Sequence, residues 1–325
     1  MRRPVLRAVL LLAAFELAAC RDSSGPDGPP LTHPALGEVS AALALSGRPH
    51  GVAASESGVF YISQIDGNSV TRGTVDSTSQ AFSGSVDVGL TPAHVALDAA
   101  ATTAYTADQS GNTVSVIDVA TNTMVGSIAL TDGGFNLAVL PNGSRLYATT
   151  ASGTLHTIDT RGLAVIGTTD VGGGANGLTF HEASSTLYVS SIQESRITEI
   201  DTRTNAIIRT YGVSDGPQRI AVSTDGSALY IASQSVGLEI LDLNTGRRAP
   251  VVGVDPGAVG LALSPDGEQV YVTNPPKGLV HIVDVASRLV VKVLSGLASP
   301  RNVAFAAWGT TAIVTGEGNE VYFIR

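Results

Sequence analysis

Two histidines and two arginines lie at corresponding places in an apolar, glycine-rich sequence. His50, His94, Arg219 and Arg301 each stand at or next to the start of a short apolar segment. A neutral imidazole can take up a proton, and a guanidinium can stabilise a developing oxyanion or hold a carboxylate. The four residues therefore indicate one of two chemistries. One is binding of an anionic or carbonyl-bearing ligand, and the other is hydrolysis of a lactone or ester with His50 or His94 as the base.

Further polar residues stand at the starts of such segments or three positions after a recurring aromatic residue. They are Gln64, Asp108, Asn136, Asn176, Gln218, Asn274 and Asn302. Side chains of this kind can orient a ligand at the mouth of a channel, or they can simply hold water there. We keep both interpretations open and expect these residues to line one channel mouth together with the two histidines and two arginines.

Metal binding is the next possibility for the same residues. A metal site needs three or four ligands with supporting hydrogen bonds around them. His50 and His94 stand in neighbouring units, but Asp108 is the only nearby carboxylate that could join them. The sequence contains neither C-x-x-C-H nor H-E-x-x-H, the patterns of haem attachment and of zinc hydrolases. We therefore predict no metal and no bound cofactor other than a lipid.

The elements that position these residues are short strands in a unit that recurs seven times. One marker is the aromatic residue of the second strand, at Tyr61, Tyr105, Tyr147, Tyr188, Tyr230 and Tyr271, with Ile313 in the last unit. The other is the aspartate that ends the third strand, at Asp76, Asp118, Asp159, Asp201, Asp242 and Asp284. Four strands in about 40 residues, repeated seven times, predict an all-β fold, a seven-bladed β-propeller with four-stranded blades.

The two ends of the repeat region predict how the ring closes. The chain stops at Arg325, where the third strand of the seventh unit ends, and the apolar segment Leu36–Leu45 belongs to no unit. We expect this N-terminal strand to complete the last blade, so that residues 36–325 form one propeller domain.

The recurring residues are expected to serve the architecture. The tyrosines should pack between blades, and aspartates followed by Thr three positions later, as at Asp118, Asp201 and Asp242, should close Asx turns. His156 and His281 share one position of the third strand, which we expect to face solvent.

A family resemblance accompanies this period. Tyr271-Val272-Thr273-Asn274, together with Gly111–Ile128, resembles the repeat of YVTN-family propellers, which include YncE-like proteins. The resemblance covers residues 36–325 and is loosest in the first unit. It implies a secreted or surface-attached bacterial or archaeal propeller, and it carries no shared set of catalytic residues.

The N-terminus predicts export. Arg2, Arg3 and Arg7 precede the apolar run Ala8–Phe15, which is too short to span a bilayer and is typical of a signal peptide. Leu17-Ala18-Ala19-Cys20 resembles a bacterial lipobox, which implies cleavage after residue 19 and a lipid on Cys20; a plain signal peptide is the alternative. Residues 20–35 then form a flexible tether. Arg21, in place of the Asp that retains lipoproteins on the inner membrane, implies the outer membrane in a cell that has one.

Composition narrows the choice of partner. The chain carries 19 Lys and Arg against 28 Asp and Glu, a net charge of −9, which argues against nucleic acid. We expect a monomeric lipoprotein that contacts the membrane through its lipid and binds a small ligand, glycan or protein without catalysis. The alternatives are a lactonase- or esterase-type hydrolase and a structural, surface-layer-like protein.

Overall fold

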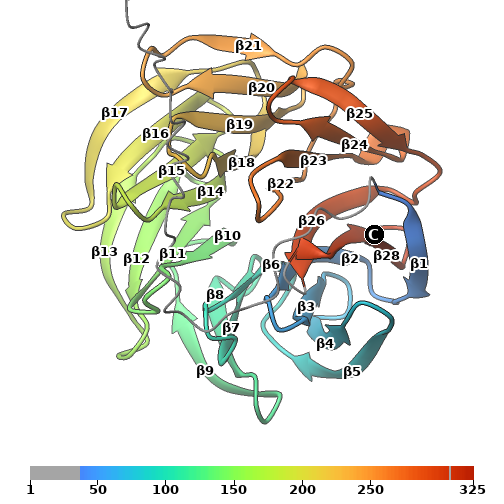
Figure 1. The fold of residues 1–325 in the computed structure, drawn as a ribbon. Helices are drawn as coiled ribbons and strands as arrows, with labels where there is room; N and C mark the ends of the chain where they lie inside the picture. The colour runs from blue at the N-terminus through green and yellow to red at the C-terminus, as the bar shows by residue number, and fades with distance from the viewer. Residues whose placement is uncertain (1–36, 307–308) are drawn as a thin grey trace, which may run out of the picture. The chain divides into compact units, whose positions relative to one another are not determined.

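The computed structural model describes residues 37–306 and 309–325, all of them in the second of two compact units, Leu31–Arg325. They form seven four-stranded antiparallel sheets arranged around a centre (Figure 1). The predicted seven-bladed, all-β propeller is therefore confirmed. The predicted signal peptide, Cys20 and the tether lie outside the described residues. Within the described residues, no helix is long and apolar enough to span a membrane.

Six blades follow chain order from the inner to the outer strand, and we number the blades in that order. Blade 1 contains β2 (Pro49–Ala54), β3 (Val59–Gln64), β4 (Ser69–Val75) and β5 (Gln80–Asp87), and blade 2 contains β6 (Pro92–Leu97), β7 (Thr103–Asp108), β8 (Thr113–Asp118) and β9 (Thr123–Ala129). Blade 3 contains β10 (Gly134–Val139), β11 (Arg145–Thr150), β12 (Thr154–Asp159) and β13 (Ala164–Asp170), and blade 4 contains β14 (Ala175–His181), β15 (Thr186–Ser191), β16 (Arg196–Asp201) and β17 (Ala206–Gly212).

Blades 5 and 6 depart slightly from this plan. Blade 5 contains β18 (Pro217–Val222), β19 (Ala228–Ser233), β20 (Gly237–Asp242) and the short outer strand β21 (Arg248–Pro250). Blade 6 contains β22 (Leu261–Leu263), β23 (Gln269–Asn274), β24 (Leu279–Asp284) and β25 (Leu289–Leu294), with the 3₁₀ turn η1 (Pro275–Lys277) between its second and third strands.

Blade 7 is built from both ends of the chain. Its inner strands are β26 (Pro300–Ala306), β27 (Thr311–Gly316) and β28 (Glu320–Ile324), and its outer strand is β1 (Val39–Ala44). β1 runs antiparallel to β28, with Ala42 opposite Tyr322. The amide of Leu45 also donates to the carbonyl oxygen of Asn319 at 2.9 Å. The predicted closure by the N-terminal strand is confirmed.

The apolar core lies between blades rather than inside them. One cluster joins Tyr271 of blade 6 to Tyr322 and Ile324 of blade 7, and the six recurring tyrosines are all buried. Two of them also donate hydrogen bonds to the next blade, because Tyr61 Oη lies 2.9 Å from Asn122 Oδ1 and Tyr147 Oη lies 3.2 Å from Asn205 Oδ1. The predicted packing role of the tyrosines is confirmed.

The recurring aspartates close turns, as predicted. Asp118 Oδ1 accepts from the amide of Thr121 at 2.7 Å, and Asp242 Oδ1 accepts from the amide of Thr245 at 2.8 Å. These N–H groups lower the pKa of both carboxyls. One carboxylate per blade is thus used by the architecture and does not form a ring of acidic ligands.

The prediction for His156 and His281 is wrong, because both side chains are buried. Their position on the third strand faces the linker that brings the chain in from the preceding blade. His156 Nε2 lies 3.0 Å from Thr131 Oγ1, and His281 Nε2 lies 3.2 Å from Asp255 Oδ2. Ser115 and Glu239 hold the equivalent linkers in blades 2 and 5. This third-strand position therefore anchors linkers.

A hydroxyl group joins the inner strands of neighbouring blades. It belongs to the Ser or Thr two residues after the recurring aromatic residue. Thr315 Oγ1 accepts from the amide of Asn302 at 3.1 Å in its own blade and donates to the carbonyl oxygen of His50 in blade 1 at 2.6 Å. Ser190 joins blades 4 and 5 in the same way, and Thr273 joins blades 6 and 7.

We predict that removal of residues 36–47 opens the ring and destabilises the whole domain. The deletion takes away β1 and exposes the edge of β28, so the midpoint of thermal unfolding should fall by at least about 10 °C, given roughly 2–4 °C per kcal/mol at this size. Circular dichroism during heating measures this. The control removes residues 21–35, which the sequence assigns to the tether. An unchanged midpoint after deletion of 36–47 would contradict the closure.

A second prediction concerns the hydroxyl bridge of Thr315. Thr315→Val keeps the side-chain shape but leaves the Asn302 amide without its partner and removes one of the two donors to the His50 carbonyl, which should cost about 1–3 kcal/mol of unfolding free energy. Urea unfolding measures the loss. Thr315→Ser, which retains the hydroxyl, is the matched control. Equal stability of the Val and Ser variants would show that the bridge contributes nothing.

Candidate functional site

Five of the predicted residues meet at the centre of the ring. They lie at the starts of the inner strands and, with Phe135 and Val259, line a small axial cavity: His50, Asn176, Arg219, Arg301 and Asn302. Its volume is about 10 Å³, which is room for about one water molecule. At this level, the side chains that we expect to line the channel mouth leave only this small space between them.

His50 and Arg301 form the closest contact in this group. Arg301 Nε donates to His50 Nε2 at 3.1 Å, while His50 Nδ1 lies 2.6 Å from the carbonyl oxygen of Ala93. Because Nε2 accepts, we place the proton on Nδ1. Burial, and next the charge of Arg301, lower the pKa of His50 to about 3. The imidazole is thus neutral at neutral pH, and its only free lone pair is taken by Arg301.

Arg219 is held by a neutral partner. Its Nε donates to Asn302 Oδ1 at 3.1 Å, and Asn302 Nδ2 donates to the carbonyl oxygen of His50 at 2.8 Å. Burial, and next the charge of Arg301, lower the pKa of Arg219 to about 9. The guanidinium therefore remains charged at neutral pH.

Three other predicted residues lie on the inner strands β6, β10 and β18, near the starts of those strands. His94 Nδ1 accepts from the amide of Leu137 at 3.2 Å, and burial lowers its pKa well below the usual value. Asn136 is buried, and its Oδ1 accepts from the same amide at 2.8 Å. Gln218 Oε1 accepts from Asn176 Nδ2 at 2.7 Å. These three side chains accept from groups of the inner strands, namely the Leu137 amide and the Asn176 side chain.

The residues three positions after the tyrosines hold loops or strands of the blades and do not line the axial cavity. Gln64 Nε2 donates to the carbonyl oxygen of Ser46 at 2.7 Å. Asp108 is fully buried and accepts from three hydroxyl groups, with burial raising its pKa and those bonds opposing the rise. Asn274 Nδ2 donates to the carbonyl oxygens of Asp255 and Pro256 at 3.1 and 2.9 Å.

The histidines and Asp108 are not gathered into a metal-binding cluster. Across residues 37–306 and 309–325, no group of three or more His, Cys, Asp or Glu side chains is placed to hold a metal ion. His50 Nδ1 is used by Ala93, and all the hydrogen-bonding partners of Asp108 are hydroxyl groups of its own blade.

A larger cavity beside the axis was not predicted from the sequence. We call it the mouth pocket; it has a volume of about 430 Å³ and is lined by Gln234, Gly257, Val259, Pro275, Pro276, Ser299 and Arg301. Arg301 and Val259 border both this pocket and the axial cavity. Pro275-Pro276 is the signal that could have revealed it, because the corresponding loops of the other blades contain no such pair.

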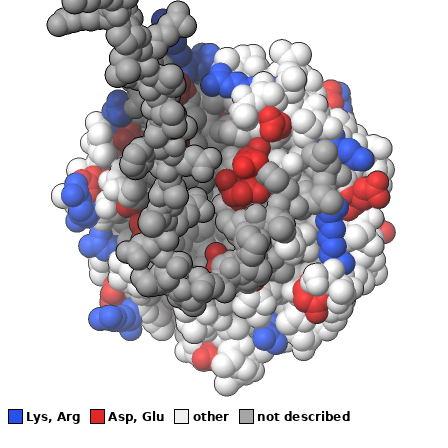
Figure 2. All heavy atoms as spheres, in the orientation of Figure 1, with Lys and Arg blue, Asp and Glu red and all other residues white. Residues whose placement is uncertain are grey.

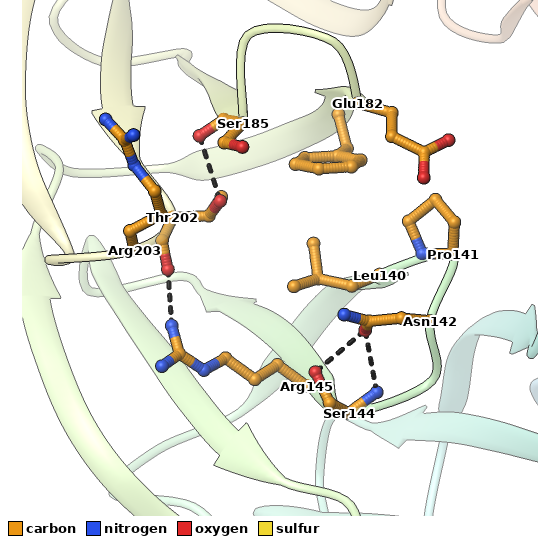
Figure 3. A pocket seen from close by; sticks show the side chains of 10 residues that line it. Leu140, Pro141, Asn142, Ser144, Arg145, Glu182, Ser185, Thr202 and Arg203 are labelled. Carbon is orange, nitrogen blue, oxygen red and sulfur yellow. Dashed lines mark hydrogen bonds between the residues drawn. The ribbon is translucent and has the colours of Figure 1, made fainter.

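A second large cavity, the blade 3–4 groove, lies where the first turn of blade 3 meets the turns of blade 4. Its volume is about 510 Å³, and Leu140, Asn142, Arg145, Phe180 and Glu182 are among its lining residues. Figure 3 shows the Arg145 side chain reaching toward Thr202, on the side of the pocket away from Glu182.

The blade 3–4 groove has a counterpart elsewhere in the ring. A groove of about 360 Å³ between blades 5 and 6 is lined by Ser227 and Ala228, which occupy the repeat positions of Ser144 and Arg145, and by Arg288 from the next blade. Asn142 Oδ1 in the blade 3–4 groove accepts from the amide and hydroxyl of Ser144 at 3.0 and 2.7 Å. Because two pairs of neighbouring blades form a groove at the same repeat positions, we attribute such grooves to the stacking of blades.

One sequence pattern that resembles a catalytic motif has a structural role. Gly212-Val213-Ser214-Asp215-Gly216 has the form G-x-S-x-G, which in hydrolases places a serine on a turn from strand to helix. Here the segment joins β17 to β18. Ser214 Oγ donates to Glu239 Oε1 at 2.8 Å, and none of the described histidines forms a hydrogen bond with it. The serine anchors a linker.

Charged side chains are dispersed over the visible face. Figure 2 shows Lys and Arg in separate groups around its rim, interspersed with Asp and Glu. The ion pairs of the blades include Arg209 Nε on the outer strand β17 with Glu199 Oε2 on the third strand β16, at 2.6 Å.

Comparisons with known proteins show the fold and nothing finer. No protein-family model matches the chain, and no curated protein matches it. Among solved structures, a chain described as Kuenenia stuttgartiensis hydrazine synthase is similar, with a TM-score of 0.76 and 18% sequence identity over 88% of this chain and 97% of that chain. At this identity the similarity supports the β-propeller alone.

We predict that stability falls as the pH decreases from 7 to 5, and that His50 causes a large part of the fall. The unfolded chain protonates this histidine near 6.5, whereas the folded protein does so only near 3, so the unfolded state binds more protons between these values. The loss from His50 at pH 5 should be about 2 kcal/mol.

The measurement is thermal unfolding at pH 7 and pH 5. His50→Gln should lower the midpoint at pH 7 but reduce the difference between the two pH values, with the remainder coming from His94, His156 and His281, whose pKa values burial also lowers. His181→Gln, which changes a half-buried histidine at the end of β14, is the control and should keep the wild-type difference. An unchanged pH dependence in His50→Gln would show that His50 is not the group responsible.

Proposed function

We propose that this protein is a non-catalytic binding module whose mouth pocket takes a small ligand with a carboxylate or carbonyl group on Arg301. One observation carries this: Arg301 borders a pocket of about 430 Å³, within the size range of small-molecule sites. Pro275, Pro276 and Val259 provide apolar walls, while Gln234 and Ser299 provide hydrogen-bonding groups. A guanidinium at one side of such a pocket suits a planar carboxylate.

The partners of Arg301 support an anionic ligand. Its Nε lies 3.8 Å from Glu317 Oε1, a long contact between side chains that are each about one quarter exposed. Burial lowers the pKa of Arg301, and Glu317 opposes this. A ligand carboxylate that approaches from the mouth pocket would add charge-assisted hydrogen bonds, which are stronger than those between neutral groups.

Binding is preferred over hydrolysis because of the state of His50. A useful general base has a pKa near the working pH and a free lone pair facing the substrate. His50 has neither, since its pKa is about 3 and its Nε2 accepts from Arg301. One observation favours the alternative, a lactonase- or esterase-type hydrolase: Arg301 Nε lies 3.1 Å from His50 Nε2. The axial cavity beside this pair, however, has a volume of about 10 Å³ and is too small for an ester.

The setting of this module is part of the proposal. The lipobox-like Leu17–Cys20 supports an exported lipoprotein anchored by a lipid on Cys20, at the outer membrane where the cell has one. The motif Tyr271–Asn274 supports a YVTN-like, YncE-like propeller. Each part of that motif has a physical role here: Tyr271 packs between blades, Thr273 bridges to the Arg301 carbonyl, and Asn274 Oδ1 accepts from the amide of Lys277 at the end of η1.

The test is a thermal-shift and calorimetric titration of the full mature chain with acetate, succinate, citrate and galacturonate. At least one of these should raise the unfolding midpoint, and Arg301→Met should weaken its binding by about 10-fold or more, because a hydrogen bond to a charged group contributes about 1.5–3 kcal/mol. Gln234 lines the mouth pocket and not the axial cavity, so Gln234→Trp fills the pocket while keeping every residue of the axial cavity, and it should also abolish binding. Arg161→Met, on an exposed turn, is the control.

Two outcomes would overturn the proposal. No midpoint shift with any of the four probes, or binding that survives both Arg301→Met and Gln234→Trp, would remove the mouth pocket from consideration. Hydrolysis of p-nitrophenyl acetate or of a homoserine lactone that is lost in His50→Gln would establish the hydrolase instead.

A further inference from the structure

The axial cavity is bordered by two cationic side chains from different blades. Arg219 comes from β18 of blade 5 and Arg301 from β26 of blade 7. Throughout the described part of the chain, no carboxylate lies within ion-pair distance of Arg219; its Nε is hydrogen-bonded to the neutral amide of Asn302. The nearest carboxylate to Arg301 is Glu317, at 3.8 Å. Among the described residues, Arg301 therefore has one ion pair, with Glu317, and Arg219 has none.

The neutral side chains around the cavity do not balance this charge. His50 is neutral and already accepts from Arg301, and Asn302 Oδ1 is already used by Arg219. Asn176 Nδ2 donates to Gln218 Oε1, while Phe135 and Val259 offer no acceptor to the cavity. The cavity lining thus has spare donors on Arg219 and Arg301 but few spare acceptors.

Arg219 and Arg301 are only partly exposed to water, so a charge on them that has no partner is incompletely solvated. Burying an ion without a partner costs several kcal/mol even after the protein relaxes, and proteins avoid this by pairing the charge. Arg219 does not avoid it by losing its proton, because it stays charged at neutral pH. A dipole such as water would solvate the guanidinium groups but would not neutralise them.

We infer that the axial cavity is a binding site for one small monovalent anion of the halide type, held between Arg219 and Arg301. The volume of about 10 Å³ admits a single sphere of roughly the size of water and has no room for a carboxylate, phosphate or sulfate. Such an anion would link blade 5 to blade 7 across the axis, so its role would be to stabilise the ring. The inference goes beyond the proposed function, which concerns the larger mouth pocket.

The first experiment compares thermal unfolding in sodium chloride and in sodium gluconate at matched ionic strength, for the full mature chain and for Gln234→Trp. Gluconate is a carboxylate, and in Gln234→Trp the filled mouth pocket keeps it from Arg301. Chloride and bromide should raise the midpoint in a saturable way, as expected for a ligand that binds only the folded state, whereas gluconate is too large to enter. Arg219→Met should lose the difference between chloride and gluconate. Arg161→Met, which removes an exposed arginine, should keep it.

The second experiment locates the ion and does not depend on a variant that folds. A crystal of the wild-type protein grown in sodium bromide should show one anomalous peak between the guanidinium groups of Arg219 and Arg301. Equal midpoints in chloride and gluconate, or water alone at the axis in bromide crystals, would overturn the inference. Gln234→Trp separates the two proposals, because it should abolish carboxylate binding and leave the chloride effect intact.

Discussion

The structure depends on the closure of a ring whose blades cannot bury their faces alone. Each four-stranded sheet is covered by its neighbours, and the clusters that pair Tyr271 with Ile324, or Phe60 with Phe323, show that the last interface is as apolar as the others. Closure rests on β1 against β28. Because the seven inner strands must then converge on one axis, the distances between them are fixed by the number of blades and not by any local sequence.

That convergence explains the residues at the axis. The backbones approach so closely that a Cβ on Gly177 or Gly260 would lie 2.3 or 2.2 Å from a carbonyl oxygen of the next blade, far inside contact distance, so only glycine fits. The same closeness lets one hydroxyl group serve two blades, as Thr273 does. It also removes water from His50, which is why an imidazole beside a guanidinium here is a weakly basic hydrogen-bond acceptor and not a general base.

The sequence predicts the fold well because the fold is encoded locally and repeatedly. Tyr61 and Tyr147, one to each blade, reveal a period that only a closed ring of small sheets can satisfy. The channel residues are predicted less well because the ladder slips at the start of the inner strands, between Pro49 and Val52 and between Pro217 and Ile220. Alternation along the strand fails there, so the sequence does not reveal which of two neighbouring residues faces the axis.

The prediction that His156 faces solvent is wrong for a related reason. Its hydrogen-bonding partner, Thr131, belongs to a linker whose path no repeat motif specifies.

The departures from sevenfold symmetry gather in blades 5 to 7, and they couple two cavities through one side chain. Arg301 borders both the axial cavity and the mouth pocket. An anion bound at the axis would neutralise part of the field that attracts a carboxylate into the mouth pocket, and binding energies linked in this way are reciprocal. If both sites are occupied, each anion must therefore weaken the other. Glu317 would limit this coupling, because it already offsets part of the charge of Arg301. Arg219 would contribute much less to the coupling, because it lines the axial cavity and not the mouth pocket.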